Sequence, residues 1–374
     1  MKKIINLIKF QDKIGEPPWD YYFLQNLPES EYPKYLAKLF YLNTGEKLPL
    51  SHGVIDKRRC KTFNRKIQWL KLYGVSDLMR DCTDKVKVRD YVKEKIGEEY
   101  LKPVLQIIPN ESHETVHCHC EQVNDNSGLA RQSRDINSDK LDCRVAQIVD
   151  APRNDRALIY KDNDSENNDV SNYFDQIHFD KLPNSFVIKT NHGCKWQYIV
   201  KNKNEFIKNK QLYETVKKNI TGWLEQKYWI WGGFEMQYKN IEPKILIEPL
   251  MRDNIDKSCQ EIQVYCFNGQ PKLIIKLHNE KEITIYDENL EISKNNLGFE
   301  ERKINIEADD LIKQSFVLSK QLSKDFIFVR TDWMIYQNKL YFEELTFTPY
   351  SGFNGFKQHK TKIKFGELIK IEGI

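Results

Sequence analysis

Acidic, basic and hydroxyl side chains recur at two-residue spacing near the C-terminal end of the sequence. Arg330 and Asp332 stand two positions apart, and so do Glu344 and Thr346. Two carboxylates that converge from neighbouring strands form a hard oxygen site suited to Mg²⁺, which takes its other ligands from water and substrate phosphates. The adjacent arginine could neutralise charge on a phosphoryl group in transfer. A salt bridge across a surface hairpin would show the same pattern.

The elements that must position these side chains are two predicted strands, at 328–336 and 340–346, joined by a short polar turn. Because alternate residues of a strand face the same side, the arginine shares a face with the aspartate. The same rule places Phe342 on the face of Glu344 and the threonine. If the two faces meet, a carboxylate from each strand lies beside the arginine and the hydroxyl.

A lysine ends a β-branched stretch in the middle of the chain. Phe186-Val187-Ile188-Lys189 predicts one strand, and residues 198–200 predict a second. The loop between them, 190–196, contains Gly193. Backbone N–H groups of such a loop, together with the lysine ammonium, could hold a polyphosphate. With a single glycine, an ordinary hairpin explains the pattern as well.

Further elements follow from periodicity, caps and turn residues. They are an amphipathic helix at 62–73 capped by Thr62, a helix at 84–97 ended by Gly97, a buried strand at 244–251, and a hairpin over 261–275 with an Asn-Gly turn. These elements indicate a mixed α/β chain.

The segment from 109 to 169 differs from the rest of the chain. It contains 13 acidic and 7 basic residues and a single aromatic residue, Tyr160. Such a stretch cannot bury enough apolar surface to offset its ordering entropy, so we expect a largely unstructured acidic insert. Its cluster His113-x-x-x-His117-Cys118-His119-Cys120 could bind zinc or copper. The spacing is not that of a paired structural zinc site, and a low-complexity accident explains it as well.

Composition limits the remaining possibilities. The chain has 374 residues, of which 40% are hydrophobic and 30% charged, and a formal net charge of +4. A balance this close argues against a dedicated nucleic-acid-binding protein. No apolar stretch reaches the length of a membrane span, and residues 1–10 lack a secretory apolar region. We therefore expect a protein of the cytoplasm or the inner membrane face, whose eight cysteines stay as thiols.

Several segments, in their order along the chain, resemble the TupA-like ATP-grasp family, which is associated with teichuronopeptide and other surface-polysaccharide biosynthesis. The resemblance covers roughly residues 56–106 and 171–356, and the 109–169 segment has no counterpart in it. The segments that carry it are Phe63 to Lys71, Asp84-Lys85 through Gly97, Lys181-Leu182-Pro183 through Gly193, Tyr265-Cys266-Phe267-Asn268-Gly269, and Glu344-Leu345-Thr346-Phe347-Thr348-Pro349 with Ser351-Gly352-Phe353.

The resemblance implies an α/β (α+β) chain with the ATP-grasp fold, in which two α+β subdomains grip ATP. Residues 1–106 would form a helical N-terminal region and the first part of the ATP-grasp unit. Residues 107–170 would form the disordered acidic insert, and residues 171–374 the nucleotide- and Mg-binding domain.

The resemblance also implies that one set of positions binds the nucleotide. These positions are the first nucleotide lysine Lys85, the second lysine Lys189 that reaches the α- and β-phosphates, the phosphate-covering loop with Asn191, His192 and Gly193, the adenine hinge Glu248, Pro249 and Leu250, and the ribose-binding carboxylate Glu261. A second set acts on the transferred phosphoryl group. It comprises the catalytic Arg330 and Lys189, and Asp332, Glu344 and Thr346 at the magnesium-ligand positions.

Three positions depart from the usual pattern of the family. Lys195 follows Cys194 in a loop that usually has a second glycine, and Gln263 replaces a common lysine. Glu343 stands where glycine is usual. These departures bear on turnover and on the substrate more than on nucleotide binding.

The function implied is an ATP- and Mg²⁺-dependent carboxylate–amine ligase that forms an amide through an acylphosphate. It would join an amino acid or amine to a uronic acid or similar component of a cell-surface polysaccharide, as free or nucleotide-sugar-linked substrates. The chain outside the acidic insert carries a net charge of +10, which fits an anionic glycan precursor. Two alternatives stay open at this point: a phosphotransferase with the same ATP site, and a non-catalytic member that binds nucleotide or glycan.

Overall fold

The computed structural model describes residues 21–109, 169–231, 233–252, 259–294, 297–299 and 301–371. The chain divides into two compact units, one made of residues 1–111 with 170–374 and the other of residues 112–169. Apart from Asp169, the second unit lies outside the described residues, and so does the predicted His/Cys metal cluster. The domain boundaries predicted near 106 and 170 stay a prediction.

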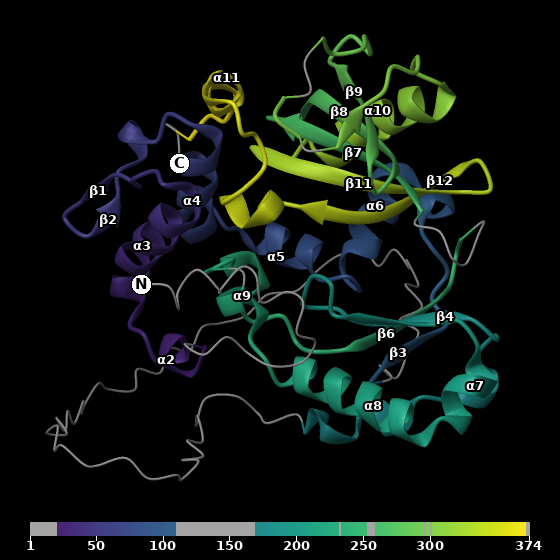
Figure 1. Cartoon of the computed structure of the whole chain (residues 1–374). Coiled ribbons are helices and arrows are strands. Elements are labelled where there is room, and N and C mark those ends of the chain that lie inside the picture. Colours follow the sequence, from purple (N-terminus) through teal and green to yellow (C-terminus); the bar gives the residue numbers. More distant parts are fainter. Residues whose placement is uncertain are drawn as a thin grey trace, which may run out of the picture. The chain divides into compact units, whose positions relative to one another are not determined.

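A six-stranded sheet contains the C-terminal strands (Figure 1). Its order is β10-β9-β8-β7-β11-β12, and all neighbours are antiparallel except β10 and β9. The strands are β7 (Gln260–Phe267), β8 (Gln270–Asn279), β9 (Glu282–Asp287), β10 (Arg302–Lys303), β11 (Phe328–Tyr336) and β12 (Lys339–Thr346). Both hairpins predicted in this part of the chain, β7–β8 and β11–β12, are present.

Two helices, α6 (Val88–Ile96) and α10 (Asp310–Leu322), share an apolar core with one face of this sheet. Val264 of β7 and Trp333 of β11 are fully buried in that core together with Ile312 of α10. The Trp333 indole N–H donates to the Ser319 hydroxyl at 2.9 Å, which satisfies its polar atom inside the core. With this face committed to the core, Arg330 and Asp332 extend from the opposite face.

A β-bulge between Asp332 and Trp333 changes the alternation expected in β12. Glu344 pairs with Asp332 and Phe342 pairs with Trp333, so Glu343 has no partner in this ladder. Phe342 is buried in the same apolar core as Trp333. The prediction that Phe342 shares a face with Glu344 is therefore wrong, because the extra residue turns two consecutive glutamates to one side of the strand.

A four-stranded antiparallel sheet has the order β3-β6-β4-β5. Its strands are β3 (Gln106–Ile108), β4 (Phe186–Thr190), β5 (Gln197–Val200) and β6 (Ile245–Pro249), and α7 (Lys203–Lys208) and α8 (Lys210–Leu224) follow β5. Phe186 and Ile188 pack in an apolar core with Ile220 of α8. Lys189 and Glu248 lie on the opposite face, because they alternate with these core residues.

The remaining helices and strands belong mostly to the N-terminal part of the chain. They are α2 (Tyr21–Gln25), α3 (Tyr32–Thr44), β1 (Leu50–Ser51), β2 (Val54–Ile55), α4 (Phe63–Tyr73), α5 (Asp77–Thr83), α9 (Tyr228–Trp231) and α11 (His359–Leu368). Single 3-10 turns occupy Glu29–Glu31, Lys57–Arg59, Glu98–Tyr100, Val170–Asn172, Phe174–Gln176, Phe179–Lys181, Met236–Tyr238 and Pro349–Gly352. No helix within the described ranges is both long and apolar enough to cross a membrane.

The predicted helix at 62–73 is confirmed as α4, whose first turn is capped because the Thr62 side chain accepts from the Arg65 backbone N–H. The helix predicted from residue 84 begins later, at Val88, and it ends at Gly97 as expected, with a φ of 103°. The Asp84 carboxylate instead accepts from the backbone N–H of Val86 at 2.9 Å, which forms a turn ahead of the helix.

A polar stripe of α4 holds a strained turn near the C-terminal end. Tyr350 and Ser351 have φ angles of 52° and 53° in the left-handed region, where each non-glycine residue costs about 1 kcal/mol. The buried side chains of Asn64, Gln68 and Lys71 donate to carbonyls of this turn, at 3.0 Å in each case. These contacts offset the strain and fix the chain that follows β12.

Candidate nucleotide and metal site

The polar side chains of β11 and β12 form one hydrogen-bonded cluster. Arg330 donates to both carboxylate oxygens of Asp332, from Nε at 2.7 Å and from an Nη at 2.6 Å. The Thr346 hydroxyl lies 3.0 Å from Asp332 Oδ2 and 2.8 Å from Glu344 Oε1. The four side chains expected to meet across the hairpin therefore do meet, and we call them the hairpin cluster.

The hairpin cluster offers oxygen ligands of the kind that Mg²⁺ prefers. Two carboxylates approach the same hydroxyl, so their oxygens converge on one region. Burial raises the pKa of Asp332 to about 7, with Arg330 opposing the shift and Glu344 adding to it. Within the described ranges no group of three or more His, Cys, Asp or Glu residues gathers as a metal site. A cation here would take its remaining ligands from water and from a substrate, as Mg²⁺ commonly does.

A second cluster lies around the lysine of β4. Lys189 Nζ contacts Glu248 Oε2 at 2.6 Å and Glu343 Oε1 at 3.5 Å. Lys102, which precedes β3, contacts the same two carboxylates, at 3.1 Å and 2.5 Å respectively. The four side chains form a closed ring of alternating charge, which we call the lysine–glutamate ring.

Each charge in the lysine–glutamate ring stabilises its neighbours. Burial alone would lower the pKa of Lys189, but the carboxylates of Glu343 and Glu248 outweigh burial and raise it. Burial would likewise raise the pKa of Glu343, but Lys102 and Lys189 lower it to about 2. The same two lysines lower the pKa of Glu248, so Lys189, Glu248 and Glu343 are charged at neutral pH. Sequence reasoning missed Lys102, because no motif or periodicity marks a lone lysine before a short strand.

The loop between β4 and β5 is anchored by its own side chains. The Asn191 amide donates to Asp84 Oδ1 at 3.0 Å and to the Glu242 carbonyl at 2.9 Å, and it accepts from the Lys244 backbone N–H at 2.7 Å. Burial and the nearby Lys85 lower the pKa of His192 to about 4, so this imidazole is neutral. These side chains hold the loop in place, and phosphate covering by the loop stays a prediction.

Gly193 and Lys85 connect this loop to the hairpin cluster. A side chain at Gly193 would overlap the Trp196 ring, with 2.4 Å between the added Cβ and the nearest ring carbon, so only glycine fits. The Lys85 ammonium donates to the Gly193 carbonyl, and its backbone N–H donates to the Asn191 carbonyl at 3.2 Å. Burial lowers the pKa of Lys85, whereas Glu344 acts to raise it. The structure thus brings Lys85, the loop and a carboxylate of the hairpin cluster together.

The predicted adenine hinge and ribose carboxylate lie at the ends of two strands. Pro249 ends β6 half-buried, and the Leu250 backbone N–H donates to the Ser185 carbonyl at 3.4 Å. The Glu248 side chain belongs to the lysine–glutamate ring, and its part in an adenine hinge stays a prediction. Glu261 lies near the start of β7, where burial and the neighbouring Glu343 raise its pKa.

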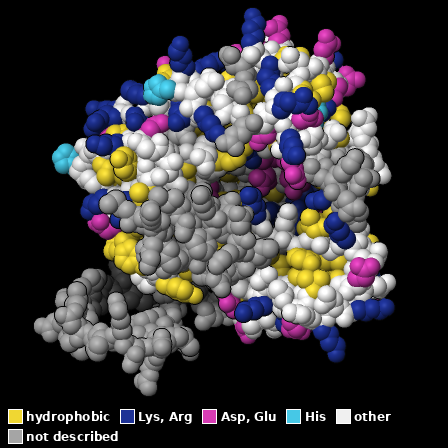
Figure 2. All heavy atoms as spheres, in the orientation of Figure 1, with side chains coloured by type: hydrophobic (Ala, Val, Ile, Leu, Met, Phe, Trp, Pro, Cys, Tyr) yellow, Lys and Arg dark blue, Asp and Glu magenta, His cyan; other side chains and the backbone are white. Residues whose placement is uncertain are grey.

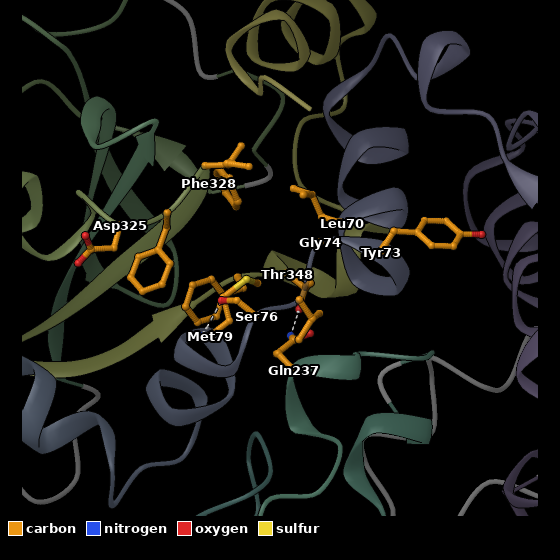
Figure 3. A pocket seen from close by; sticks show the side chains of 13 residues that line it. Leu70, Tyr73, Gly74, Ser76, Met79, Gln237, Asp325, Phe328 and Thr348 are labelled. Carbon is orange, nitrogen blue, oxygen red and sulfur yellow. Dashed lines mark hydrogen bonds between the residues drawn. The ribbon is translucent and has the colours of Figure 1, made fainter. Parts of the chain in front are cut away.

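Charged side chains of both signs gather around a hollow on the face of the molecule drawn in Figure 2. A separate cavity of about 280 Å³ lies beside the C-terminal end of β12 and is lined by Leu70, Phe328 and Thr348, among others (Figure 3). Gln237 donates to the Thr348 hydroxyl across its wall at 2.8 Å. None of the predicted site residues lines this cavity.

Comparison of the sequence with models of protein families shows which family the chain belongs to. The model of the family described as TupA-like ATPgrasp matches residues 156–370, which is more than half of the chain. The chain belongs to the TupA-like ATP-grasp family. The assignment expected from the sequence is confirmed, and so is the mixed α/β architecture of the ATP-grasp fold. The family is named for the ATP-grasp fold, and the match supports an ATP-dependent carboxylate–amine ligase in general terms.

Solved structures with a related fold are distant. D-alanine–D-alanine ligase from Bacillus anthracis is 16% identical, with 79% of this chain and 67% of that chain covered and a TM-score of 0.32. The Helicobacter pylori D-alanine–D-alanine ligase is 15% identical, with 54% and 53% covered and a TM-score of 0.29. The ATP-grasp ligase PsnB, complexed with precursor peptide PsnA2 and AMPPNP, is 12% identical, with 46% and 38% covered and a TM-score of 0.22. No curated protein sequence matches the chain.

Proposed function

We propose that this TupA-like ATP-grasp protein uses ATP and Mg²⁺ to join a carboxylate and an amine, one of which belongs to a component of a cell-surface polysaccharide. The observation that supports the proposal most directly is the hairpin cluster, in which two carboxylates and a hydroxyl converge beside a buried arginine. We assign the Mg²⁺ to Asp332, Glu344 and Thr346. When bound, the metal would neutralise charge on the phosphates of ATP.

The proposed reaction has two steps. The acceptor carboxylate attacks the γ-phosphorus of ATP, the bond from that phosphorus to the bridging oxygen of ADP breaks, and an acylphosphate forms. The amine then attacks the acyl carbon, phosphate leaves, and the nitrogen loses a proton to give the amide. Little covalent chemistry falls to the protein, so positioning and charge neutralisation are its main contributions.

We propose a role for each group of the site on this basis. Arg330 stabilises negative charge on the transferred phosphoryl group, and Lys189 with Lys85 binds the phosphates. The loop with Asn191, His192 and Gly193 covers the phosphates. Pro249 and Leu250, next to Glu248, meet the adenine, and Glu261 binds the ribose hydroxyls. The use of ATP as co-substrate supports a reaction in the cytoplasm or at the inner face of the membrane.

We propose a uronic acid or similar acidic sugar, free or linked to a nucleotide, as the carboxylate, and an amino acid or other amine as its partner. The net charge of +10 outside residues 109–169 supports an anionic substrate. Neither substrate is a nucleic acid.

Mass spectrometry of the products tests the proposal. The full chain is incubated with Mg-ATP, mixed amino acids and a panel of uronic-acid acceptors, and we expect ADP, phosphate and an amide-linked product. A phosphorylated acceptor without an amide would instead indicate a phosphotransferase. Nucleotide binding without any turnover over the whole panel would indicate a non-catalytic nucleotide- or glycan-binding protein. Either of these results would overturn the ligase proposal.

A further inference from the structure

Glu343 occupies an unusual place in the lysine–glutamate ring. The bulge in β12 turns both Glu343 and Glu344 to the side of the site, but the two carboxylates have different partners. Glu344 contacts Thr346, whereas Glu343 contacts Lys102 at 2.5 Å and Lys189 at 3.5 Å. Glu343 therefore contacts Lys189, the lysine that we expect to bind phosphate, and this contact is longer than its contact with Lys102.

The four members of the ring are not equally enclosed. The side chains of Lys102, Lys189 and Glu248 are 7–8% exposed, whereas that of Glu343 is 34% exposed. Glu343 is by far the most exposed member of the ring, so it is the member that can move when another anion arrives.

A nucleotide phosphate that binds Lys189 carries a charge of the same sign as Glu343. Both groups would then form an ion pair with the Lys189 ammonium. Two like charges about 4 Å apart repel by about 1 kcal/mol even in water, and by more in a partly enclosed site. A phosphate placed against Lys189 would therefore repel Glu343 and weaken its contact. Lys102 offers Glu343 an alternative partner at a distance that is already short.

We propose that Glu343 is an exchangeable counter-ion of Lys189, displaced by the nucleotide phosphate, and that Lys102 is a positioning residue that holds Glu343 after the exchange. The inference rests on the proposed function in one respect, since it takes the nucleotide phosphate as the ligand of Lys189. It adds that nucleotide affinity is set by a pair of residues that do not contact the nucleotide. Lys102 also contacts Glu248 at 3.1 Å, and we assign its effect on the nucleotide to the shorter contact with Glu343.

The test measures binding of Mg²⁺ with the non-hydrolysable ATP analogue AMPPNP to the full chain by isothermal titration calorimetry. Glu343→Gln keeps the shape of the side chain and removes its charge, so we expect binding about tenfold tighter than wild type. Lys102→Met leaves Glu343 with Lys189 as its partner, so we expect binding about tenfold weaker. Lys102→Arg keeps the charge and is expected to bind like wild type.

The double variant gives the decisive result, because it separates an effect of Lys102 through Glu343 from an effect through Glu248. In the Glu343→Gln background, Lys102→Met is expected to change the affinity by less than about twofold, so the two effects are not additive. Glu280→Gln is the matched control, since Glu280 is exposed in the β8–β9 turn and is not a member of the ring. Thermal unfolding of each variant verifies that it is folded before titration.

Several outcomes would overturn the exchange. One is binding that is unchanged or weaker in Glu343→Gln, which would show that the carboxylate does not compete with the phosphate. Another is full additivity in the double variant, which would show that Lys102 acts on the nucleotide directly or through Glu248 and not through Glu343. Absence of AMPPNP binding to folded wild-type protein would overturn the proposed function as well, whereas equal binding by all folded variants would overturn the exchange alone.

Discussion

The hairpin cluster and the lysine–glutamate ring are both sets of buried, oppositely charged side chains, but they are assembled differently. The hairpin cluster comes from β11 and β12, which are neighbours in sequence and in the sheet. The ring brings together strands of two different sheets and the segment before β3, with contacts between residues up to 241 positions apart. One cluster depends on strand register, and the other depends on how the whole unit packs.

The two clusters also differ in their charge balance. The hairpin cluster places two carboxylates against one arginine, which leaves an excess of negative charge suited to a cation. The ring has two lysines and two glutamates and is neutral. A local hairpin thus carries the group expected to bind metal, and a long-range ring carries the groups expected to govern the nucleotide.

Neutralising a carboxylate of the hairpin cluster is expected to have the largest effect. Asp332→Asn and Glu344→Gln each remove one proposed ligand charge while preserving shape, and we expect ATP turnover to fall at least about 100-fold. ADP release in a coupled assay measures the effect, with Glu280→Gln as the control. Full activity in both variants would exclude this cluster as the metal site.

Removing an enclosed carboxylate from the ring tests whether the ring also stabilises the fold. Glu248→Gln leaves two buried lysines with one shared partner, and we expect the free energy of unfolding to fall by about 4 kcal/mol. Glu343→Gln also leaves the two lysines with one shared partner, Glu248, but the carboxylate that it removes is more exposed, so we expect a smaller loss of about 1 kcal/mol. Urea denaturation measures both, and equal losses would contradict the distinction between an enclosed and an exchangeable carboxylate.

The β4–β5 loop follows Lys189 of the ring, and the stability of the protein should depend on pH through His192 in this loop. The pKa of His192 is about 4 in the folded protein and about 6.5 when exposed, so the unfolded chain binds more protons between these values. Stability therefore falls as the pH drops from about 6.5 to 4, by up to about 3 kcal/mol. Urea denaturation at several pH values measures this slope. In His192→Gln the free energy of unfolding should depend less on pH between about 6.5 and 4, because the buried imidazole is absent. An unchanged slope would contradict the assignment of a buried neutral imidazole.

Gly193→Ala tests the same loop through packing. The new methyl group would overlap the Trp196 ring, and we expect a loss of about 2 kcal/mol in the free energy of unfolding. Gly222→Ala in α8 is the control, because the added methyl group meets only a distant glutamine amide and the helix gains a better helix former. Thermal denaturation compares the two, and an equal change in both variants would contradict the close approach of Gly193.

The sequence predicted the parts that depend on local periodicity. Alternation and a short turn were enough for the hairpin with Arg330 and Asp332, and capping was enough for α4. The bulge at Asp332 could not be predicted, because it depends on how Trp333 packs against α10. Alternation without the bulge therefore put Phe342 on the wrong face.

The lysine–glutamate ring could not be predicted for a different reason. The sequence marked Lys189 and Glu248 for the nucleotide and Glu343 as a departure from the family, but it gave no reason to connect the three residues. Contact among these three residues requires the two sheets to pack in one particular relative position. No spacing of residues along the chain predicts that position. The amphipathic pattern of α4 likewise predicted a core helix but could not show that Gln68 and Lys71 are buried polar residues with distant partners.

Hydrogen bonds from α4 hold the left-handed turn, and they limit how far the chain can be shortened. The hydrogen bond from Asn64 to the Gly352 carbonyl spans 288 residues, and Lys66 reaches the Ile369 carbonyl at 2.7 Å. The stretch recognised by the family, 156–370, therefore ends in a segment whose polar groups are satisfied by a helix outside it. Expressed alone, that stretch would lack the partners of these carbonyls, so the minimal soluble fragment must retain α4.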